Sequence, residues 1–289
     1  MHKLESLGLR SARRSSASLM GERRSRARGQ SVEFADHRNY SSGDDFRYVD
    51  WNLYGRLEKL FLKLYEEERE LPVLLVLDRS ESMRFGSPSK FGLARVLAGG
   101  IATVALAGFD RVSVRCFPAE GIPSAAQEII RSVRGKKALG RFLTALESVT
   151  PSGNAPFSEA LTTIARESRG RGLAVVISDF LDEAGYQAGL EAFLSRGHDV
   201  VAIQILSPEE VRPDAYGDLR LVDAETGLAR EVTFGKFRLA AYQKMVNGYC
   251  GRLKEYCASR GIRQLFVRSD AVPKEVLLKQ FRSAGILTD

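Results

Sequence analysis

The stretch "LPVLLVLDRSESM", residues 71–83, joins an apolar run to a short polar motif. The run is made almost entirely of Leu and Val and ends at Asp78, as is typical of a strand buried on both faces of a sheet. Ser80 and Ser82 follow directly. We therefore expect a buried strand whose carboxyl end carries one carboxylate and two hydroxyls.

Strand-like and helix-like segments alternate along the rest of the chain. Further strands are expected over residues 111–117, 172–179, 199–206 and 262–270, with helical segments between most of them. Strands that are joined through helices pair in parallel and have helices on both faces. The sequence thus predicts an α/β fold with a doubly wound, mostly parallel sheet and a β-hairpin insertion near residues 218–234.

Length and composition are those of a globular protein. The chain has 289 residues, of which 44% are hydrophobic and 27% charged, which fits one large domain with an extension. We expect a basic, partly disordered arm over residues 1–30, a segment over 31–70 that packs on the domain, and the α/β domain over 71–289. Residues 1–20 lack apolar periodicity, so we expect them to be dispensable for folding.

Much of the net charge of +7 comes from arginines near the amino terminus. These are Arg10, Arg13, Arg14, Arg23, Arg24, Arg26 and Arg28. A solvated arm explains this excess, and no aromatic residues alternate with the arginines to stack on single-stranded nucleic acid. A nucleic-acid partner is therefore disfavoured, and a basic nucleic-acid-associated factor stays open as an alternative.

The cysteines and the apolar runs bear on the compartment. Cys116, Cys250 and Cys257 cannot all pair and form no C-x-x-C unit, which favours the reducing cytoplasm. The N-terminal positive charges are not followed by an apolar segment, as a secretory signal would require. The most apolar run, over residues 96–109, is shorter than the ~18–20 residues of a membrane helix, so we expect no membrane span.

A second predicted strand also ends in an aspartate, Asp179. Ligands of doubly wound sheets gather outside the carboxyl ends of the strands. Asp78, Ser80, Ser82 and Asp179 offer the hard oxygen ligands that Mg²⁺ prefers. The motif around Asp78 has a second explanation, in which the aspartate caps a turn and the serines bond to the local backbone.

Several motifs together resemble known proteins. "LDRSESM", "SGNAPFSEAL" and "VVISDF" resemble the von Willebrand factor A fold with its metal-ion-dependent adhesion site. The charged segment over residues 21–70 and the later "LVDAETG" are similar to the bacterial family called domain of unknown function 58. The resemblance spans roughly residues 20–287.

The resemblance to the von Willebrand factor A fold implies a ligand set. It assigns Asp78, Ser80 and Ser82 from the first motif and Asp179 from the third to Mg²⁺ or Mn²⁺, held weakly. In intact sites of this fold, the open position of the ion takes a carboxylate from a partner protein. The resemblance therefore implies recognition of proteins and no organic cofactor.

The second motif departs from the pattern. Ala155 stands where the fold has a threonine, so one oxygen ligand is missing. Asn154, Ser152, Ser158 or a water could substitute for it. A functional metal site and a vestigial one both stay open.

The family resemblance further implies a non-enzymatic interaction module. Such a module works beside a MoxR-type AAA+ ATPase, as an adaptor in maturation, remodelling or metal insertion of a protein client. The alternative is a metal-dependent hydrolase that uses Asp78 and Asp179. We expect no catalytic residues, because Ser80 replaces the second aspartate of a D-x-D phosphatase motif and neither a P-loop nor a G-x-S-x-G motif occurs.

The segment "YSSGDDFRYVDWNLYGR", residues 40–56, is dense in charged and aromatic residues. Neighbouring carboxylates in an extended segment point apart, and nearby arginines suit ion pairing. We expect a structural network or a partner surface, with Trp51 anchoring the segment on the sheet domain. The candidate residues are Arg38, Asp44, Asp45, Arg47, Asp50, Trp51 and Arg56.

Overall fold

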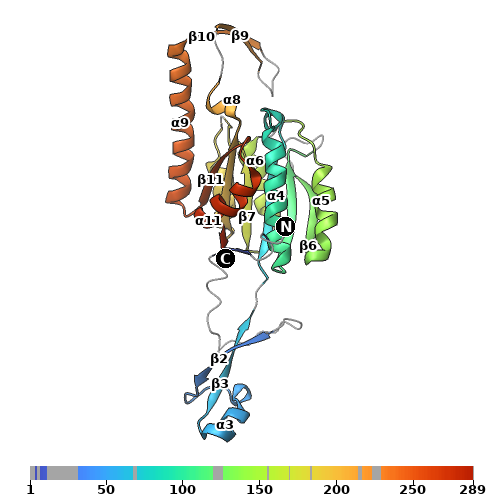
Figure 1. The fold of residues 1–289 in the computed structure, drawn as a ribbon, viewed down its shortest axis with the longest axis vertical. Helices are drawn as coiled ribbons and strands as arrows, with labels where there is room; N and C mark the ends of the chain where they lie inside the picture. The colour runs from blue at the N-terminus through green and yellow to red at the C-terminus, as the bar shows by residue number, and fades with distance from the viewer. Residues whose placement is uncertain are drawn as a thin grey trace. The chain divides into compact units, whose positions relative to one another are not determined.

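The chain forms two compact units, and each is described by itself: residues 1–11 with 71–289, and residues 12–70 (Figure 1). The computed structural model describes residues 4, 7–11, 32–67, 70–119, 126–154, 156–168, 170–182, 184–213, 217–222 and 229–288.

The larger unit is built on a six-stranded sheet with the strand order β11-β8-β7-β4-β5-β6. The strands are β4 (Pro72–Asp78), β5 (Arg111–Phe117), β6 (Gln127–Arg134), β7 (Leu173–Ser178), β8 (Asp199–Leu206) and β11 (Arg263–Arg268). Neighbouring strands are parallel except β5 and β6, which are antiparallel. The α/β fold with a mostly parallel sheet, expected from the sequence, is confirmed.

Helices cover both faces of this sheet (Figure 1). The first face carries α4 (Lys90–Ala107), α5 (Leu139–Glu147) and the C-terminal turns α10 (Pro273–Glu275), η4 (Val276–Gln280) and α11 (Phe281–Ser283). The second face carries α6 (Phe157–Glu167), α7 (Gln187–Ser195) and the C-terminal half of α9 (Lys236–Ser259). The sheet is therefore the middle layer of three.

The central strand β4 is buried on both faces, which is why its sequence is apolar without alternation. Leu75 and Leu77 belong to the buried cluster under α4, whereas Leu74 and Val76 belong to the cluster under α6 and α7. Successive side chains of a strand point to opposite faces, so a strand covered on both faces is apolar throughout.

Residues 7–11, which the sequence assigned to a dispensable arm, contact the sheet domain. The short strand β1 (Gly8–Leu9) pairs antiparallel with β12 (Leu287–Thr288). Leu7 and Leu9 are 5% and 2% exposed and join the cluster under α4. This contact could not be predicted from the sequence, because β1 has only two residues. The rest of the arm, 12–30 and most of 1–6, lies outside the described residues.

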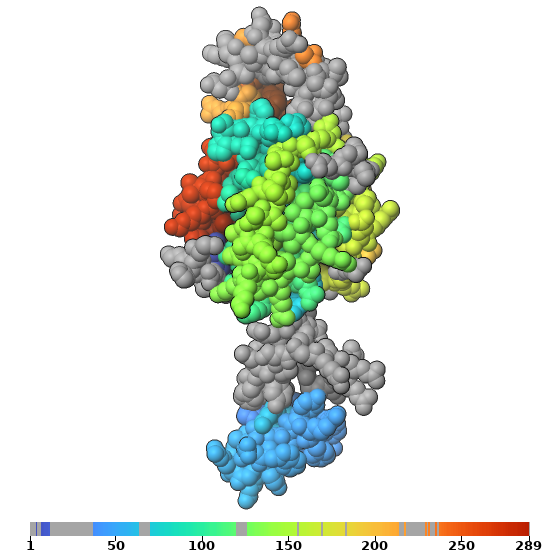
Figure 2. All heavy atoms as spheres, turned by 90° about the vertical axis from the view of Figure 1, so that its right-hand side faces the viewer, coloured from blue at the N-terminus to red at the C-terminus, as the bar shows by residue number. Residues whose placement is uncertain are grey.

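The antiparallel edge strand β6 was not predicted. Only Ile130 in it is buried, and the other described side chains are half-buried or exposed. An edge strand with one lightly covered face shows little apolar pattern, so residues 127–134 did not stand out in the sequence. In Figure 2, β6 and α5 lie on the face turned to the viewer.

Shorter elements complete the larger unit. The strands β9 (Gly217–Val222) and β10 (Ala229–Phe234) pair antiparallel, which is the hairpin expected near residues 218–234. The turns η2 (Glu81–Arg84), η3 (Lys136–Ala138) and α8 (Pro208–Val211) follow β4, β6 and β8.

One helix in the described part of the chain, α4, is long and apolar enough to cross a membrane by length and composition. It has 18 residues and a mean hydropathy of 1.4, and 78% of it is buried inside the unit. Helices in protein cores share these properties. The expected absence of a membrane span stays a prediction.

The smaller unit pairs β2 (Val32–Asn39) with β3 (Phe61–Glu67) in antiparallel fashion. Between them lie η1 (Phe46–Tyr48) and α3 (Trp51–Leu57). Asp50 caps α3, since its side chain accepts hydrogen bonds from the backbone N–H groups of Asn52 and Leu53. The packing of residues 31–70 on the sheet domain stays a prediction.

Candidate functional site

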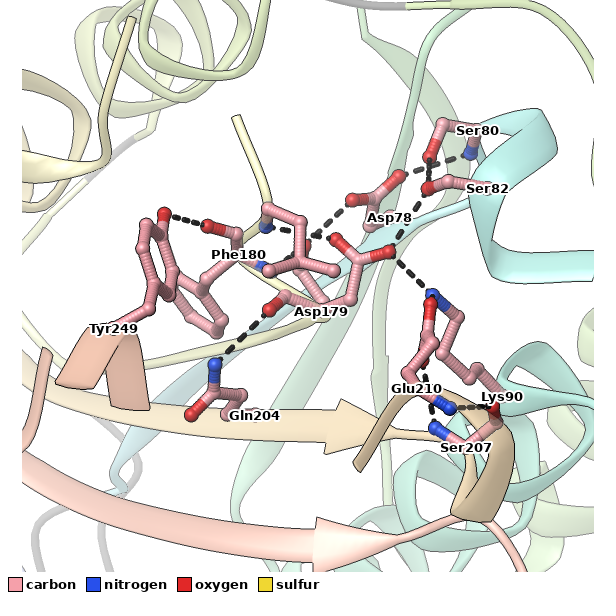
Figure 3. Close-up of polar contacts among 12 residues, drawn as sticks. Asp78, Ser80, Ser82, Lys90, Asp179, Phe180, Gln204, Ser207, Glu210 and Tyr249 are labelled. Carbon is pink, nitrogen blue, oxygen red and sulfur yellow. Dashed lines mark hydrogen bonds and ion pairs between the residues drawn. The ribbon is translucent and has the colours of Figure 1, made fainter. Parts of the chain in front are cut away.

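The four oxygen-bearing residues of the first and third motifs meet at the carboxyl ends of two adjacent strands (Figure 3). The parallel pairing of β4 with β7 brings Asp78 and Asp179 to the same end of the sheet. Their exposed fractions are 3% each, and that of Ser80 is 5%. Ser82 in η2 is half-buried and is the more accessible of the two serines.

Hydrogen bonds join these side chains into one network (Figure 3). The Ser80 and Ser82 hydroxyl oxygens are 3.0 Å apart, and Ser82 donates to Asp179 Oδ2 over 2.9 Å. Asp78 accepts from the backbone N–H of Ser80 over 2.9 Å and from the Ser178 hydroxyl over 2.6 Å. Asp78 thus caps the local turn, as the second explanation of the motif expects. The serine hydroxyls bond to each other and to Asp179, as the convergence of oxygens expects.

The loop of the second motif lies against the first motif. The backbone N–H of Ser152 donates to the carbonyl of Arg79, and that of Glu81 donates to the carbonyl of Gly153. Ala155 lies outside the described residues. Asn154 is half-buried at the described end of this loop.

Ser158, one of the suggested substitutes for the threonine, is engaged elsewhere. Its hydroxyl donates to the carbonyl of Gly185 over 2.7 Å, in the turn before α7. This hydrogen bond links α6 to the turn before α7; among the described residues, no hydrogen bond from the Ser158 hydroxyl to Asp78 or Asp179 is seen.

Two charged residues that the sequence did not suggest complete the site. Lys90, the first residue of α4, is fully buried, and its Nζ lies 2.7 Å from Asp179 Oδ2 and 2.5 Å from Glu210 Oε1 (Figure 3). Glu210 belongs to α8, which follows β8. The only signal in the sequence was a lysine at the start of an otherwise apolar buried helix, a position usually exposed for lysine.

The backbone after Asp179 is held in an unusual conformation. Phe180 has a φ of 60°, in the left-handed region that residues with a side chain rarely adopt. Its N–H donates to the Ser178 hydroxyl over 2.9 Å, and its carbonyl accepts from the Tyr249 hydroxyl of α9. These bonds fix the direction in which Asp179 leaves the strand.

The electrostatics of the site follow from burial. Burial and the neighbouring charge of Asp179 raise the pKa of Asp78 above its usual range. Burial also acts to lower the pKa of Lys90, but the charges of Asp179 and Glu210 outweigh it, so the pKa of Lys90 is raised and the ammonium stays charged. The site therefore holds crowded carboxyl groups around one buried positive charge.

The residues fit a divalent ion by donor type, because carboxylates and hydroxyls are the oxygen ligands of Mg²⁺ and Mn²⁺. Across the residues that the structure describes, no group of three or more His, Cys, Asp or Glu side chains is placed to hold a metal. The serine hydroxyls and waters would have to complete the coordination shell.

Residues 38–47 of the smaller unit contain two ion pairs. Arg38 donates to Asp44 over 2.9 Å, and Arg47 pairs with Asp45. The structure thus places these four side chains in pairs.

The other candidate residues of this unit surround α3. Asp50 caps the helix and lies 3.0 Å from His37 Nε2. Trp51 is 59% exposed and stacks edge-on against Tyr54, and Arg56 is exposed. Trp51 is not buried within its own unit, and its role as an anchor on the sheet domain stays a prediction.

Some solved structures are similar to this chain at low sequence identity. BatB from Bacteroides thetaiotaomicron is 18% identical with a TM-score of 0.45, and the match covers 74% of this chain and 98% of that one. A von Willebrand factor type A structure from Catenulispora acidiphila is 12% identical with a TM-score of 0.41, covering 78% of this chain and 43% of that one. These similarities concern the fold alone.

The chain is similar to curated mycobacterial proteins and matches one family model. "Uncharacterized protein Mb1516" of Mycobacterium bovis and "Uncharacterized protein Rv1480" of Mycobacterium tuberculosis are each 32% identical over 208 residues. The match covers 70% of this chain and 64% of each relative, so the chain spans slightly less than two thirds of their length. The family model described as "Protein of unknown function DUF58" matches residues 36–247, well over half of the chain. The chain therefore belongs to the DUF58 family.

Proposed function

We propose that this chain is a non-enzymatic protein-interaction module, a cytoplasmic adaptor that links a MoxR-type AAA+ ATPase to a protein client during maturation or remodelling. The observation that supports it is the convergence of Asp78, Ser80, Ser82 and Asp179 at the ends of two adjacent central strands. Clefts at such strand ends are where ligands of α/β sheets bind.

The rim of the site suits a protein partner. Phe85, just after η2, is 48% exposed, and Leu181, two residues after Asp179, is 47% exposed. Exposed apolar side chains around a polar centre are typical of contact surfaces between proteins. Ser82 lies three residues before Phe85 and is half-buried, so a polar group of a partner can reach its hydroxyl.

A divalent ion has a defined place in this proposal. Ser80 and Ser82 would ligate Mg²⁺ or Mn²⁺ directly, and Asp78 and Asp179 would hold its waters. The ion would supply positive charge that attracts a carboxylate of the partner. With alanine at position 155, we expect the isolated protein to hold it weakly.

In the described part of the larger unit, no histidine lies at this site to act as the base of a hydrolase. His37 belongs to the smaller unit and bonds to Asp50. His198 precedes β8, at the amino ends of the strands, and bonds to the Ser168 hydroxyl. An assay for Mg²⁺-dependent turnover of generic phosphoesters separates the two functions, since the module should show none.

Affinity capture tests the adaptor role. Tagged wild-type protein should retain a MoxR-type ATPase from its source cells, and the Asp78→Asn variant should retain less, because Asp78 anchors Ser80 and Ser178. The proposal is wrong if the wild-type protein retains no such ATPase, or if both baits retain it equally.

A further inference from the structure

Lys90, with an exposed fraction of 0%, is one of the most deeply buried charged side chains among the described residues of the larger unit. It starts α4, where the Ser89 hydroxyl accepts the N–H of Gly92 over 3.2 Å and caps the helix. From there the side chain reaches the strand-end site (Figure 3). A lysine is almost never buried in this way unless its charge is paired.

The ammonium of Lys90 is held by two elements that follow neighbouring strands. Asp179 directly follows β7, and its Oδ2 accepts a hydrogen bond from Lys90 Nζ over 2.7 Å. Glu210 accepts over 2.5 Å and is itself positioned by a capping box, in which its other oxygen accepts the N–H of Ser207 over 2.7 Å. The position of the ammonium is therefore fixed by the fold rather than by chance contact of flexible side chains.

Both oxygens of the Asp179 carboxylate accept hydrogen bonds. Oδ2 accepts from both Lys90 and Ser82, and Oδ1 accepts from the N–H of Leu181 over 3.0 Å. A divalent ion that approached Asp179 would have to compete with an ammonium already in contact with it. The two positive charges would also repel each other.

We propose that the Lys90 ammonium is the built-in cation of this site, which orients Asp179 and Ser82 without a divalent ion and keeps the affinity for divalent ions low. This inference rests on the proposed function, because it concerns the same site. According to this inference, the expected weak affinity for divalent ions has two causes, the Lys90 ammonium and the missing oxygen ligand at Ala155. It also means that the site can be organised for a partner in the absence of metal.

Mn²⁺ binding to purified full-length variants tests the role of Lys90. Lys90→Met keeps an unbranched side chain that is one atom shorter and removes the charge. The double variant Lys90→Met with Glu210→Gln also removes the negative charge that would be left unpaired at Glu210. Lys279→Met is the matched control, since Lys279 is exposed and pairs with Glu275 on the surface of η4 over 3.0 Å.

Calorimetric titration with Mn²⁺ should show a gain in affinity of about tenfold or more for both Lys90 variants over the wild type. A positive charge within ~4–6 Å lowers the proton affinity of a carboxylate by about one to three log units, and we expect it to lower the affinity for Mn²⁺ in the same way. Lys279→Met should match the wild type. Mn²⁺ should also raise the thermal midpoint of the Lys90 variants more than that of the wild type, since a ligand stabilises most the protein that binds it most tightly.

Equal Mn²⁺ affinity in the wild type and the Lys90 variants, or no binding by any of them, would overturn the inference. If the Lys90 variants fold only when Mn²⁺ is added, the metal has replaced the ammonium and the inference holds; if Mn²⁺ does not restore their folding, it fails. Capture of the ATPase is measured separately. A wild type that captures no partner would therefore refute the proposed function and leave the metal result intact.

Discussion

Replacing Leu9 by alanine tests whether the amino-terminal strand β1 stabilises the sheet domain. Leu9 is 2% exposed and pairs with Leu287, which is 3% exposed. Leu→Ala changes in protein cores cost about 2–5 kcal/mol, depending on how far the surroundings collapse. Since β1 has only two residues and lies at the border of the cluster, we expect the lower half of that range, about 2–3 kcal/mol.

A loss of that size should be plain in a thermal melt followed by circular dichroism. For a domain of this length, about 2–3 kcal/mol corresponds to a fall of the midpoint by roughly 4–12 °C. Leu181→Ala is the matched control, because Leu181 is 47% exposed and the same atoms are removed from the surface. If Leu9→Ala lowers the midpoint no more than Leu181→Ala, or if deletion of residues 1–11 leaves it unchanged, then β1 does not stabilise the domain.

Three further predictions concern other parts of the chain. An added Cβ at Gly172 would lie 2.1 Å from the Pro72 carbonyl oxygen, so Gly172→Ala should lower the free energy of unfolding in urea by about 1–3 kcal/mol; Gly235→Ala, with nothing within 4 Å, should not. A hydrogen bond from His37 lowers the pKa of Asp50 from 3.8 to about 2, so the cap of α3 stabilises at higher pH and is lost as pH falls through about 2; a change of Trp51 emission near pH 4 instead would contradict this. Burial raises the pKa of Cys116 to about 12, so alkylation of Cys116 should require unfolding, and rapid labelling of the native protein would refute its burial.

The strands β4, β7 and β8 could be predicted because burial on both faces requires a nearly continuous apolar sequence. Val175 and Val176 of β7 face opposite clusters, as Leu74 and Leu75 do in β4. The edge strand β6 has no such run, since Ile130 is its only buried residue. Strand β1 has two residues, which is too short for any periodicity.

The oxygen cluster could be anticipated because each aspartate directly ends an apolar strand. Its cationic half could not, because Lys90 and Glu210 are 120 residues apart and meet only in the folded chain. A lysine at the first position of a helix is ordinarily solvated, and a glutamate in a four-residue helix ordinarily caps it. Glu210 does cap its helix, and the same carboxylate also holds Lys90.

Equilibrium binding of a purified MoxR-type ATPase from the same source tests the central claim, that the strand-end site is the recognition surface. The comparison is between the wild type, Ser82→Ala and the control Ser195→Ala, whose hydroxyl bonds to the carbonyl of Ala192 at the far end of α7. Because Ser82 links Ser80 to Asp179, its loss should weaken binding about tenfold, the effect of one hydrogen bond to a charged group. Ser195→Ala should bind like the wild type. Equal affinity of all three proteins, or no binding of the wild type, would contradict the claim.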